Sequence, residues 1–286
     1  MPDPVTSEPA DVPADVPADV PADAIVDAIA AEPTGAAHPR YRRQPVSFVR
    51  RSARLTTAQR KAWDTRRDRY LVDVPRDVTV ASVDPAWRLD PAQVFGRTAP
   101  LVVEIGSGQG EAIVAAAAAH PERDHLAVEV YTPGLAQTIV RAGHAGADPG
   151  RDGGAPGNEL GNLRLVEADA AELLATALPE ASVDELWVFF PDPWHKSRHQ
   201  KRRLVTPAFA AVVARALRPG GVWRLATDWS HYADQMIEVL EASDDFRNAH
   251  GPGVRAPRFD GRVLTSFERK GSAAGRAATD LEYVRG

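Results

Sequence analysis

Cysteine is absent from this chain of 286 residues, which excludes disulfides and thiolate metal sites. A protein without cysteine fits a reducing cytoplasm, and this is the location that we expect. No apolar run approaches the roughly 20 residues that a membrane-spanning helix needs, so we expect no membrane partner. The N-terminal stretch is acidic and rich in proline. It therefore has the character of neither a signal peptide nor an Arg-rich transit peptide.

Basic residues are missing from the first part of the chain, and acids are scarce in the next part. Residues 1–37 contain eight acids and no Lys or Arg, and they repeat Asp-Val-Pro-Ala from residue 11. Such a segment has little to bury, so we predict a disordered acidic tail over 1–37. Residues 38–70 contain eleven Lys and Arg against two acids. We assign 38–99 to a basic arm and helix, and 100–286 to a folded domain.

The basic arm carries a helix signal. Thr56 and Gln59 have the spacing of a capping box, and Trp63 and Tyr70 then recur at helical spacing beside arginines. A basic helix that bears aromatic residues suits the phosphate backbone of a nucleic acid, because each bound cation releases counterions. The alternative is an exposed helix that Trp63 docks onto the domain.

The domain opens with a strand, a glycine turn and a helix. An apolar run from residue 101 carries Glu104 near its end, and Gly106, Gly108 and Gly110 follow before an Ala-rich stretch. Such a unit binds nucleotides, because glycines let the backbone approach the ligand and the helix N-terminus faces it. The spacing lacks the third glycine of the dinucleotide pattern, and Glu104 would repel a pyrophosphate. An ammonium, such as that of S-adenosylmethionine, would be attracted instead, which argues against an NAD oxidoreductase.

Two further strands end in acids. The run 125–130 carries Glu129, at a place where an acid accepts hydrogen bonds from ribose hydroxyls. The run 162–169 ends in Asp169, which is placed to accept from an adenine amino group. Each acid alone is more often a helix cap or a solvated charge. Three in succession around one glycine turn predict a cofactor site.

The remainder alternates strands and helices, which predicts a doubly wound, mostly parallel sheet. We expect a helix over 170–177, another from Thr206 and a strand over 222–227 that leads to Asp228. Asp228 is either the N-cap of the next helix or a substrate contact. The Gly- and Pro-rich residues 145–161 predict a flexible insertion loop. Polar and apolar residues alternate around 262–271, so we predict antiparallel edge strands that close the sheet within 258–286.

The stretch Phe-Phe-Pro-Asp-Pro-Trp-His-Lys-Ser-Arg-His-Gln-Lys-Arg-Arg, residues 189–203, combines a carboxylate, an indole and five Lys and Arg. It follows a buried strand, and Pro-Asp-Pro forces a loop there. Ligands of open α/β sheets bind beyond such strand ends. The alternative is a rigid turn with a solvated charge run. His195 and His199 are spaced i, i+4, but the missing thiolates and the adjoining cations argue against a metal site.

Together these residues resemble the bacterial tRNA (guanine-N7)-methyltransferase family over roughly residues 47–285, apart from the 145–161 loop. The segment 189–203 is the most specific piece. Supporting pieces are Glu-Ile-Gly-x-Gly-x-Gly at 104–110, Glu-Val-Tyr-x-Pro-Gly at 129–134, Asp-Ala at 169–170, Ala-Thr-Asp-Trp at 226–229 and Thr-x-Phe-Glu at 265–268.

The resemblance implies a Rossmann-like class I methyltransferase fold of α/β type. It implies methyl transfer from S-adenosyl-L-methionine to N7 of the guanine at position 46 in the tRNA variable loop. tRNA is the implied partner, no metal is expected, and both monomer and homodimer stay open. The resemblance assigns the cofactor to Glu104, Gly106, Gly108, Glu129, Asp169 and Asp192, catalysis to Asp192, the substrate to Lys196, Asp228, Thr265, Ser266, Phe267 and Glu268, and RNA to Arg198, Lys201, Arg202 and Arg203.

Three local departures from the family pattern bear on substrate detail. Ser266 stands where the family usually has Lys or Arg, Thr279 stands where a Trp is common, and residues 145–161 look like an insertion. None of the three touches the acids.

The implied reaction does not require a proton to be removed from the base. Guanine N7 has an in-plane lone pair and no proton, so attack on a sulfonium methyl needs positioning and charge stabilisation rather than a base. We expect Asp192 to orient the base, with Asp228 and Glu268 at its Watson–Crick edge, while Trp194 either stacks on the base or braces the loop. Two alternatives are an exocyclic-amine methyltransferase, because Pro-Asp-Pro-Trp is similar to the acidic-Pro-Pro-aromatic loops of such enzymes, and a non-enzymatic RNA-binding module.

Overall fold

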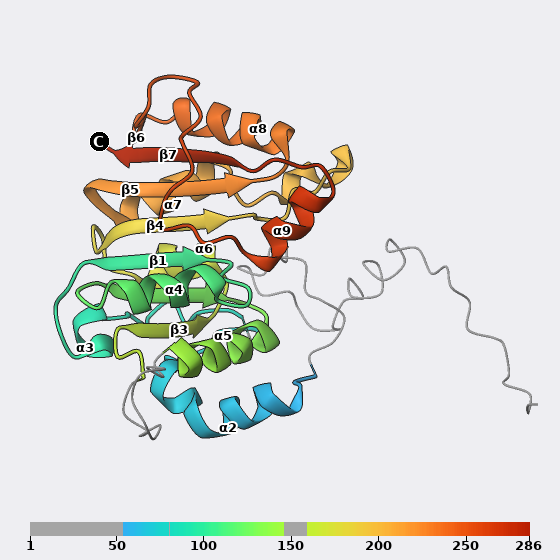
Figure 1. Cartoon of the computed structure of the whole chain (residues 1–286). Coiled ribbons are helices and arrows are strands. Elements are labelled where there is room, and N and C mark those ends of the chain that lie inside the picture. Colours follow the sequence, from blue (N-terminus) through green and yellow to red (C-terminus); the bar gives the residue numbers. More distant parts are fainter. Residues whose placement is uncertain (1–53, 80, 146–158) are drawn as a thin grey trace, which may run out of the picture. The chain divides into compact units, whose positions relative to one another are not determined.

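The computed structural model describes residues 54–79, 81–145 and 159–286, and within them one sheet has seven strands in the order β3-β2-β1-β4-β5-β7-β6 (Figure 1). Strands β1 to β5 run parallel, and β7 lies antiparallel between β5 and β6. The elements are α2 (Thr57–Tyr70), α3 (Pro91–Phe95), β1 (Leu101–Ile105), α4 (Glu111–Ala119), β2 (Asp124–Glu129), α5 (Thr132–Ala145), β3 (Leu163–Glu167), α6 (Ala170–Glu172), the π-helix η1 (Leu173–Ala177), β4 (Val183–Phe189), the 3₁₀-helix η2 (Ser197–Arg202), α7 (Pro207–Ala216), β5 (Leu217–Thr227), α8 (Ser230–Glu241), β6 (Phe246–Asn248), α9 (Ser266–Ala273) and β7 (Thr279–Arg285).

Three of our expectations concern other parts of the chain. The acidic tail at 1–37, the basic residues up to 53 and most of the insertion loop lie outside the described residues. Across the ranges that are described, no helix combines the length and the apolar character that crossing a membrane requires.

Helices cover both faces of the sheet. Every residue of β1 is buried, as expected for a central parallel strand. Val102 and Trp187 pack on one face with α2, α4 and α5, whereas Val103 and Trp223 pack on the other face with α7 and α8. The predicted doubly wound sheet is therefore confirmed.

The helix signal at residue 56 is also confirmed. The Thr56 hydroxyl accepts from the Gln59 amide at 3.3 Å, and the Gln59 side chain accepts from the Thr56 amide at 2.9 Å. Helix α2 docks on α5 and buries Tyr70 completely. At Gly143 of α5, an added Cβ would lie 1.7 Å from the Arg66 guanidinium, so this glycine leaves the space for that arginine. Helix α2 therefore shares its core with the sheet.

The closing strands are antiparallel as predicted, but one of our assignments was wrong. Residues 262–271 do not form a strand, because α9 begins at Ser266. The Thr265 hydroxyl accepts from the Glu268 amide at 3.2 Å, which is the helix-starting contact of a Thr-x-x-Glu sequence. This local cap outweighed the polar and apolar alternation. The sheet is instead closed by β7 and β6.

The predicted helix at 170–177 is shorter than expected. Only Ala170–Glu172 is α-helical, and Leu173–Ala177 continues as a π-helix.

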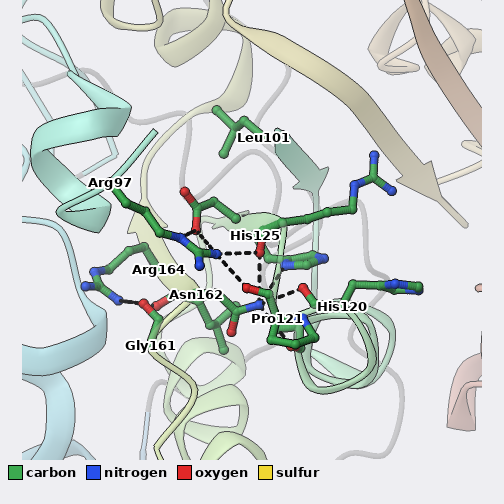
Figure 2. A network of polar contacts seen from close by, with 12 residues as sticks. Arg97, Leu101, His120, Pro121, His125, Gly161, Asn162 and Arg164 are labelled. Carbon is green, nitrogen blue, oxygen red and sulfur yellow. Dashed lines mark hydrogen bonds and ion pairs between the residues drawn. The ribbon is translucent and has the colours of Figure 1, made fainter. Parts of the chain in front are cut away.

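A polar network fixes the amino ends of the strands, opposite the glycine turn (Figure 2). The Asn162 side-chain nitrogen donates to the carbonyls of Ala117, Arg123 and His120 at 2.9 to 3.1 Å. Burial lowers the pKa of the neighbouring His125 to about 4, so this imidazole is neutral at physiological pH. Arg97 pairs with Asp124 at the start of β2. With this end held by internal contacts, the other end of the sheet carries the candidate site.

Candidate active site

The glycine turn after β1 is the centre of the candidate site. Gly106, Gly108 and Gly110 have φ values of 69°, 57° and 72°, a left-handed region that glycine adopts without strain. Helix α5 approaches this turn so closely that a Cβ on Gly134 would lie 2.3 Å from the Gly108 carbonyl oxygen. The turn is therefore held between α4 and the start of α5, as a backbone cradle for a ligand requires.

Glu104 is buried beside this turn. Its side chain is on β1, it is 5% exposed, and its Oε2 has no hydrogen-bond partner among the described residues. Burial raises the pKa of Glu104 to about 8, and the nearby Glu129 adds to this effect, while the Ile113 amide opposes it. Within the same described ranges, the buried Ser107 hydroxyl also has no hydrogen-bond partner. Orphaned acceptors of this kind fit a cationic ligand that supplies the missing donors.

Glu129 lies at the end of β2 and reaches back to the turn. Its carboxylate accepts from the amides of Gly108 at 2.8 Å, Val130 at 2.7 Å and Tyr131 at 3.0 Å. Burial raises the pKa of Glu129, these amides oppose the rise, and the charge of Asp192 adds to it. The structure therefore brings together Glu104, Glu129 and Asp192, which come from three strand ends.

Asp169 occupies the expected strand end and also serves as a helix cap. Its carboxylate accepts from the Glu172 amide at 3.1 Å at the start of α6. Its own amide donates to the Ala81 carbonyl at 2.7 Å. These contacts fix the position of the acid next to the predicted cofactor site.

The loop after β4 is strained on both sides of Asp192. Phe190 and Trp194 have φ values of 54° and 42°, which cost non-glycine residues of the order of 1–3 kcal/mol each. The Phe190 amide donates to the Ala226 carbonyl of β5 at 2.7 Å, which fixes the start of the loop. Strain of this kind persists only where the surrounding structure holds the backbone in place, and Asp192 lies between the two strained residues.

Trp194 braces the loop from within. The Arg202 guanidinium lies 5.1 Å from its ring centroid, and His199 meets the ring edge-on at 5.9 Å. His195 faces Trp229 instead, with centroids 6.0 Å apart. The two histidines thus lie against different aromatic rings.

The basic residues of this loop divide into two groups. Lys196, Arg198 and Lys201 are exposed, as a nucleic-acid contact requires. Arg203 is only 3% exposed and donates to the Pro193 carbonyl at 2.8 Å, with its guanidinium 4.7 Å from the Tyr232 ring centroid. The structure therefore does not bring Arg203 to the surface with the others.

Asp228 lies against α9. Asp228 does not cap α8, whose N-cap is Trp229, and its carboxylate instead pairs with Arg276 at 2.7 Å. A Cβ on Gly271 would lie 2.7 Å from this carboxylate, so α9 packs directly against it. Phe267 is 48% exposed, and its ring centroid lies 5.5 Å from that of Phe190. An aromatic surface therefore adjoins the strained loop.

Glu268 is turned inward, where it is 4% exposed. It pairs with Arg258 and with Arg262, which lies 2.7 Å away and also pairs with Asp280 at 2.7 Å. Burial alone would raise the pKa of Glu268, but the hydrogen bonds and charges of the two arginines lower it below its usual range. Sequence reasoning missed both arginines, since nothing in the spacing of Arg258 or Arg262 indicates a buried partner.

The remaining two predicted residues start α9. Thr265 is its N-cap, and the Ser266 amide and hydroxyl both donate to Glu111 at the start of α4. Glu111 was not among the predicted site residues.

Comparison with known proteins places the chain in a family. A family model described as "Putative methyltransferase" matches residues 98–281. The chain is 46% identical to a tRNA (guanine-N(7)-)-methyltransferase of Cutibacterium acnes, over 99% of this chain and 98% of that protein. The chain belongs to the bacterial tRNA (guanine-N7)-methyltransferase family. Another member of that name, from Paenarthrobacter aurescens, is 46% identical over 85% of this chain and 92% of its own length.

The fold is also similar to that of a solved structure. The 16S rRNA methyltransferase KamB covers 74% of this chain and 100% of its own, with a TM-score of 0.50 and 18% identity. The expected Rossmann-like class I methyltransferase fold is thus confirmed, together with the family resemblance.

Proposed function

We propose that this protein transfers a methyl group from S-adenosylmethionine to N7 of a guanine in tRNA. The observation that carries the proposal is the 46% identity, over almost the whole of both chains, with a relative named for this reaction. The family resemblance of the segment 189–203 makes position 46 of the variable loop the target. With tRNA as substrate, the proposal also places the enzyme in the cytoplasm.

The cofactor assignment rests on the acids around the glycine turn. We assign the ammonium of S-adenosylmethionine to Glu104, whose buried Oε2 receives no hydrogen bond from the part of the chain that the structure describes. The ribose hydroxyls are assigned to Glu129 and the adenine amino group to Asp169, at the ends of β2 and β3. The turn amides around Gly106 and Gly108 form the backbone part of this site. When bound, S-adenosylmethionine supplies an electrophilic sulfonium methyl group.

The protein's own contribution is position and charge. A bond forms between N7 and the methyl carbon while the carbon–sulfur bond breaks, and its electron pair stays on sulfur. No proton has to leave the base, so no residue is required as a general base. Asp192, in its strained loop, orients the guanine and stabilises the positive charge that arrives on the imidazole ring. Phe267 and Asp228 hold the base from the side of α9.

Two predicted residues receive positioning roles in this proposal. Glu268 fixes α9 through Arg258 and Arg262, and Arg203 holds the Pro193 carbonyl one residue after Asp192. Trp194 braces the loop through Arg202 and His199. A side chain engaged in this way shapes the site without touching the base.

Exposed cations then hold the RNA. Lys196, Arg198 and Lys201 lie beside the catalytic loop, with Arg202 half-buried among them. The exposed Arg60 and Lys61 of α2 extend the basic character to another element. Arg66 and Arg69 of α2 instead face Glu159 at 3.7 Å and 2.5 Å. Phosphate contacts by such side chains make binding strongly salt-dependent.

One experiment tests the reaction. The purified protein is incubated with an unmodified tRNA transcript and methyl-labelled S-adenosylmethionine, and the labelled base is mapped by strand scission specific for N7-methylguanine. We expect scission at the variable-loop guanine and no label in a transcript with adenine at that position. Label on an exocyclic amine would favour the alternative amine methyltransferase, and tRNA binding without label would favour an RNA-binding module.

A further inference from the structure

Glu111 connects the cofactor half of the site to the substrate half. It is the first residue of α4, directly after the glycine turn, and its side chain reaches the start of α9, 155 residues later in the chain. Its Oε2 accepts from the Ser266 amide at 2.7 Å, and its Oε1 accepts from the Ser266 hydroxyl at 2.6 Å. The two helices meet at the edge of the sheet where β1 and β4 end (Figure 1).

The electrostatics favour this arrangement. An acid in the first turn of α4 is stabilised by the positive end of that helix, and here the same carboxylate faces the N-terminus of α9. Two arginines lie beside it, Arg141 of α5 at 3.2 Å and Arg269 of α9 at 3.9 Å. The Glu111 side chain is largely buried, which limits screening by solvent. The Glu111 carboxylate of α4 thus contacts residues of both α5 and α9.

Each end of this connection leads into a different part of the site. On the α4 side, the Ile113 amide faces Glu104, and Gly110 is packed against Thr138 so that a Cβ would lie 2.4 Å away. On the α9 side, Ser266 is followed by Phe267 and Glu268. The glycine turn and α9 are therefore joined by a charged, two-point contact.

We propose that Glu111 is a positioning residue that couples occupation of the cofactor site to the binding of tRNA. Ligand binding at the glycine turn fixes α4, and the Glu111–Ser266 contact then holds α9 in the position that receives the guanine. By linkage, tRNA on α9 tightens cofactor binding by the same factor. The inference rests on the proposed function, because it assigns tRNA to α9.

The test measures this coupling with S-adenosylhomocysteine, which cannot transfer a methyl group. Its Kd is determined with and without tRNA for wild type, Glu111→Ala, Glu111→Gln and the matched surface control Glu122→Ala. We expect tRNA to tighten binding severalfold in wild type and in the control, and Glu111→Ala to lose most of that ratio. We expect the Kd of Glu111→Ala for S-adenosylhomocysteine without tRNA to stay within about twofold of the wild-type value. By the same linkage, the Kd for tRNA in the presence of S-adenosylhomocysteine rises by the same severalfold factor in Glu111→Ala. Glu111→Gln keeps one hydrogen-bond acceptor, so we expect its coupling ratio to lie between those of wild type and Glu111→Ala.

A double-mutant cycle identifies the contact. Ser266→Ala removes only the hydroxyl, so we expect it to lose less of the coupling than Glu111→Ala does. In the Glu111→Ala background, we expect Ser266→Ala to cause no further loss of coupling. A tRNA-independent Kd in wild type overturns the inference, as does full coupling in Glu111→Ala. A lower melting temperature with unchanged coupling assigns Glu111 a structural role only and also overturns it. Failure of the proposed function would be distinguishable from failure of this inference, because the wild type would then transfer no methyl group to tRNA.

Discussion

Replacing Glu104 by Gln removes a buried carboxyl group whose ionisation the free protein disfavours. The unfolded chain has the ordinary carboxyl pKa of 4.5, whereas burial raises the folded value to about 8. The folded state therefore holds an extra proton between these values, and stability falls as the pH rises from 4.5 to 8. At higher pH the full penalty is about 5 kcal/mol. Because Gln carries no such penalty, and 1 kcal/mol shifts the melting temperature of a domain of this size by about 2–4 °C, we expect Glu104→Gln to melt roughly 10–20 °C above wild type at pH 8.5 and close to it at pH 5.

The same group predicts proton release on cofactor binding. At pH 6.5 a carboxyl with a pKa of about 8 is protonated over ionised by about 30 to 1. The α-amino group of S-adenosylmethionine, with an ordinary pKa of about 8, is then already charged. Pairing the two requires Glu104 to ionise, so binding releases close to one proton.

Calorimetry in buffers of different ionisation enthalpy measures this proton directly. We expect about one proton released by wild type and by the exposed control Glu122→Gln, almost none by Glu104→Gln, and weaker binding of S-adenosylmethionine by that variant. Wild-type binding without proton release would refute the reasoning, as would a Glu104→Gln protein that melts below wild type at pH 8.5.

Three further predictions concern the rest of the site. Asp192→Asn keeps size and loses charge, so we expect kcat to fall about 10²-fold or more with tRNA affinity retained, and near wild-type turnover would contradict the assigned role. Arg262→Met leaves Glu268 and Asp280 buried without their shared partner, at a cost of about 3–5 kcal/mol in urea denaturation. The exposed control Arg255→Met should cost at most about 1 kcal/mol. Because the pKa of Glu268 is lowered in the folded state, its ionised form stabilises the fold above the ordinary carboxyl pKa, and this stabilisation is lost as the pH falls through the folded-state pKa. The difference in unfolding free energy between wild type and Arg262→Met should therefore become smaller in acid. Lys201→Ala should lower the slope of log Kd against log salt for tRNA by roughly 0.7–0.9. Arg247→Ala, on the distant strand β6, should leave the slope unchanged.

The parts of the site that were predictable are those that local sequence determines. Glu104, Glu129 and Asp192 follow or end apolar strands, and the topology of a doubly wound sheet alone brings such ends together. Helix α9 is also encoded locally, by Thr265 and Glu268, but the alternation of polar and apolar residues around them predicts a strand. The capping signature was the better guide.

The inward turn of Arg203 and Glu268 could not be predicted from sequence. An arginine in a basic run looks like its neighbours, and the environment of Arg203 comes from Pro193 and Tyr232, which lie 10 residues before it and 29 after it. The partners of Glu268 are contributed by a loop whose path is fixed only when β7 supplies Asp280. Long-range burial of this kind leaves no local pattern.

The position of β7 has a consequence for the order of synthesis. This strand is the last of the sheet to leave the ribosome, yet it lies between β5 and β6 rather than at an edge. Until Thr279–Arg285 has emerged, β5 presents an unpaired edge, β6 lacks its strand partner, and Arg262 lacks Asp280. Strands β1 to β4 precede β7 in the chain, whereas the buried pair of Arg262 with Asp280 can form only once β7 has emerged. Until β7 emerges, the open edge of β5 can therefore accept a non-native strand.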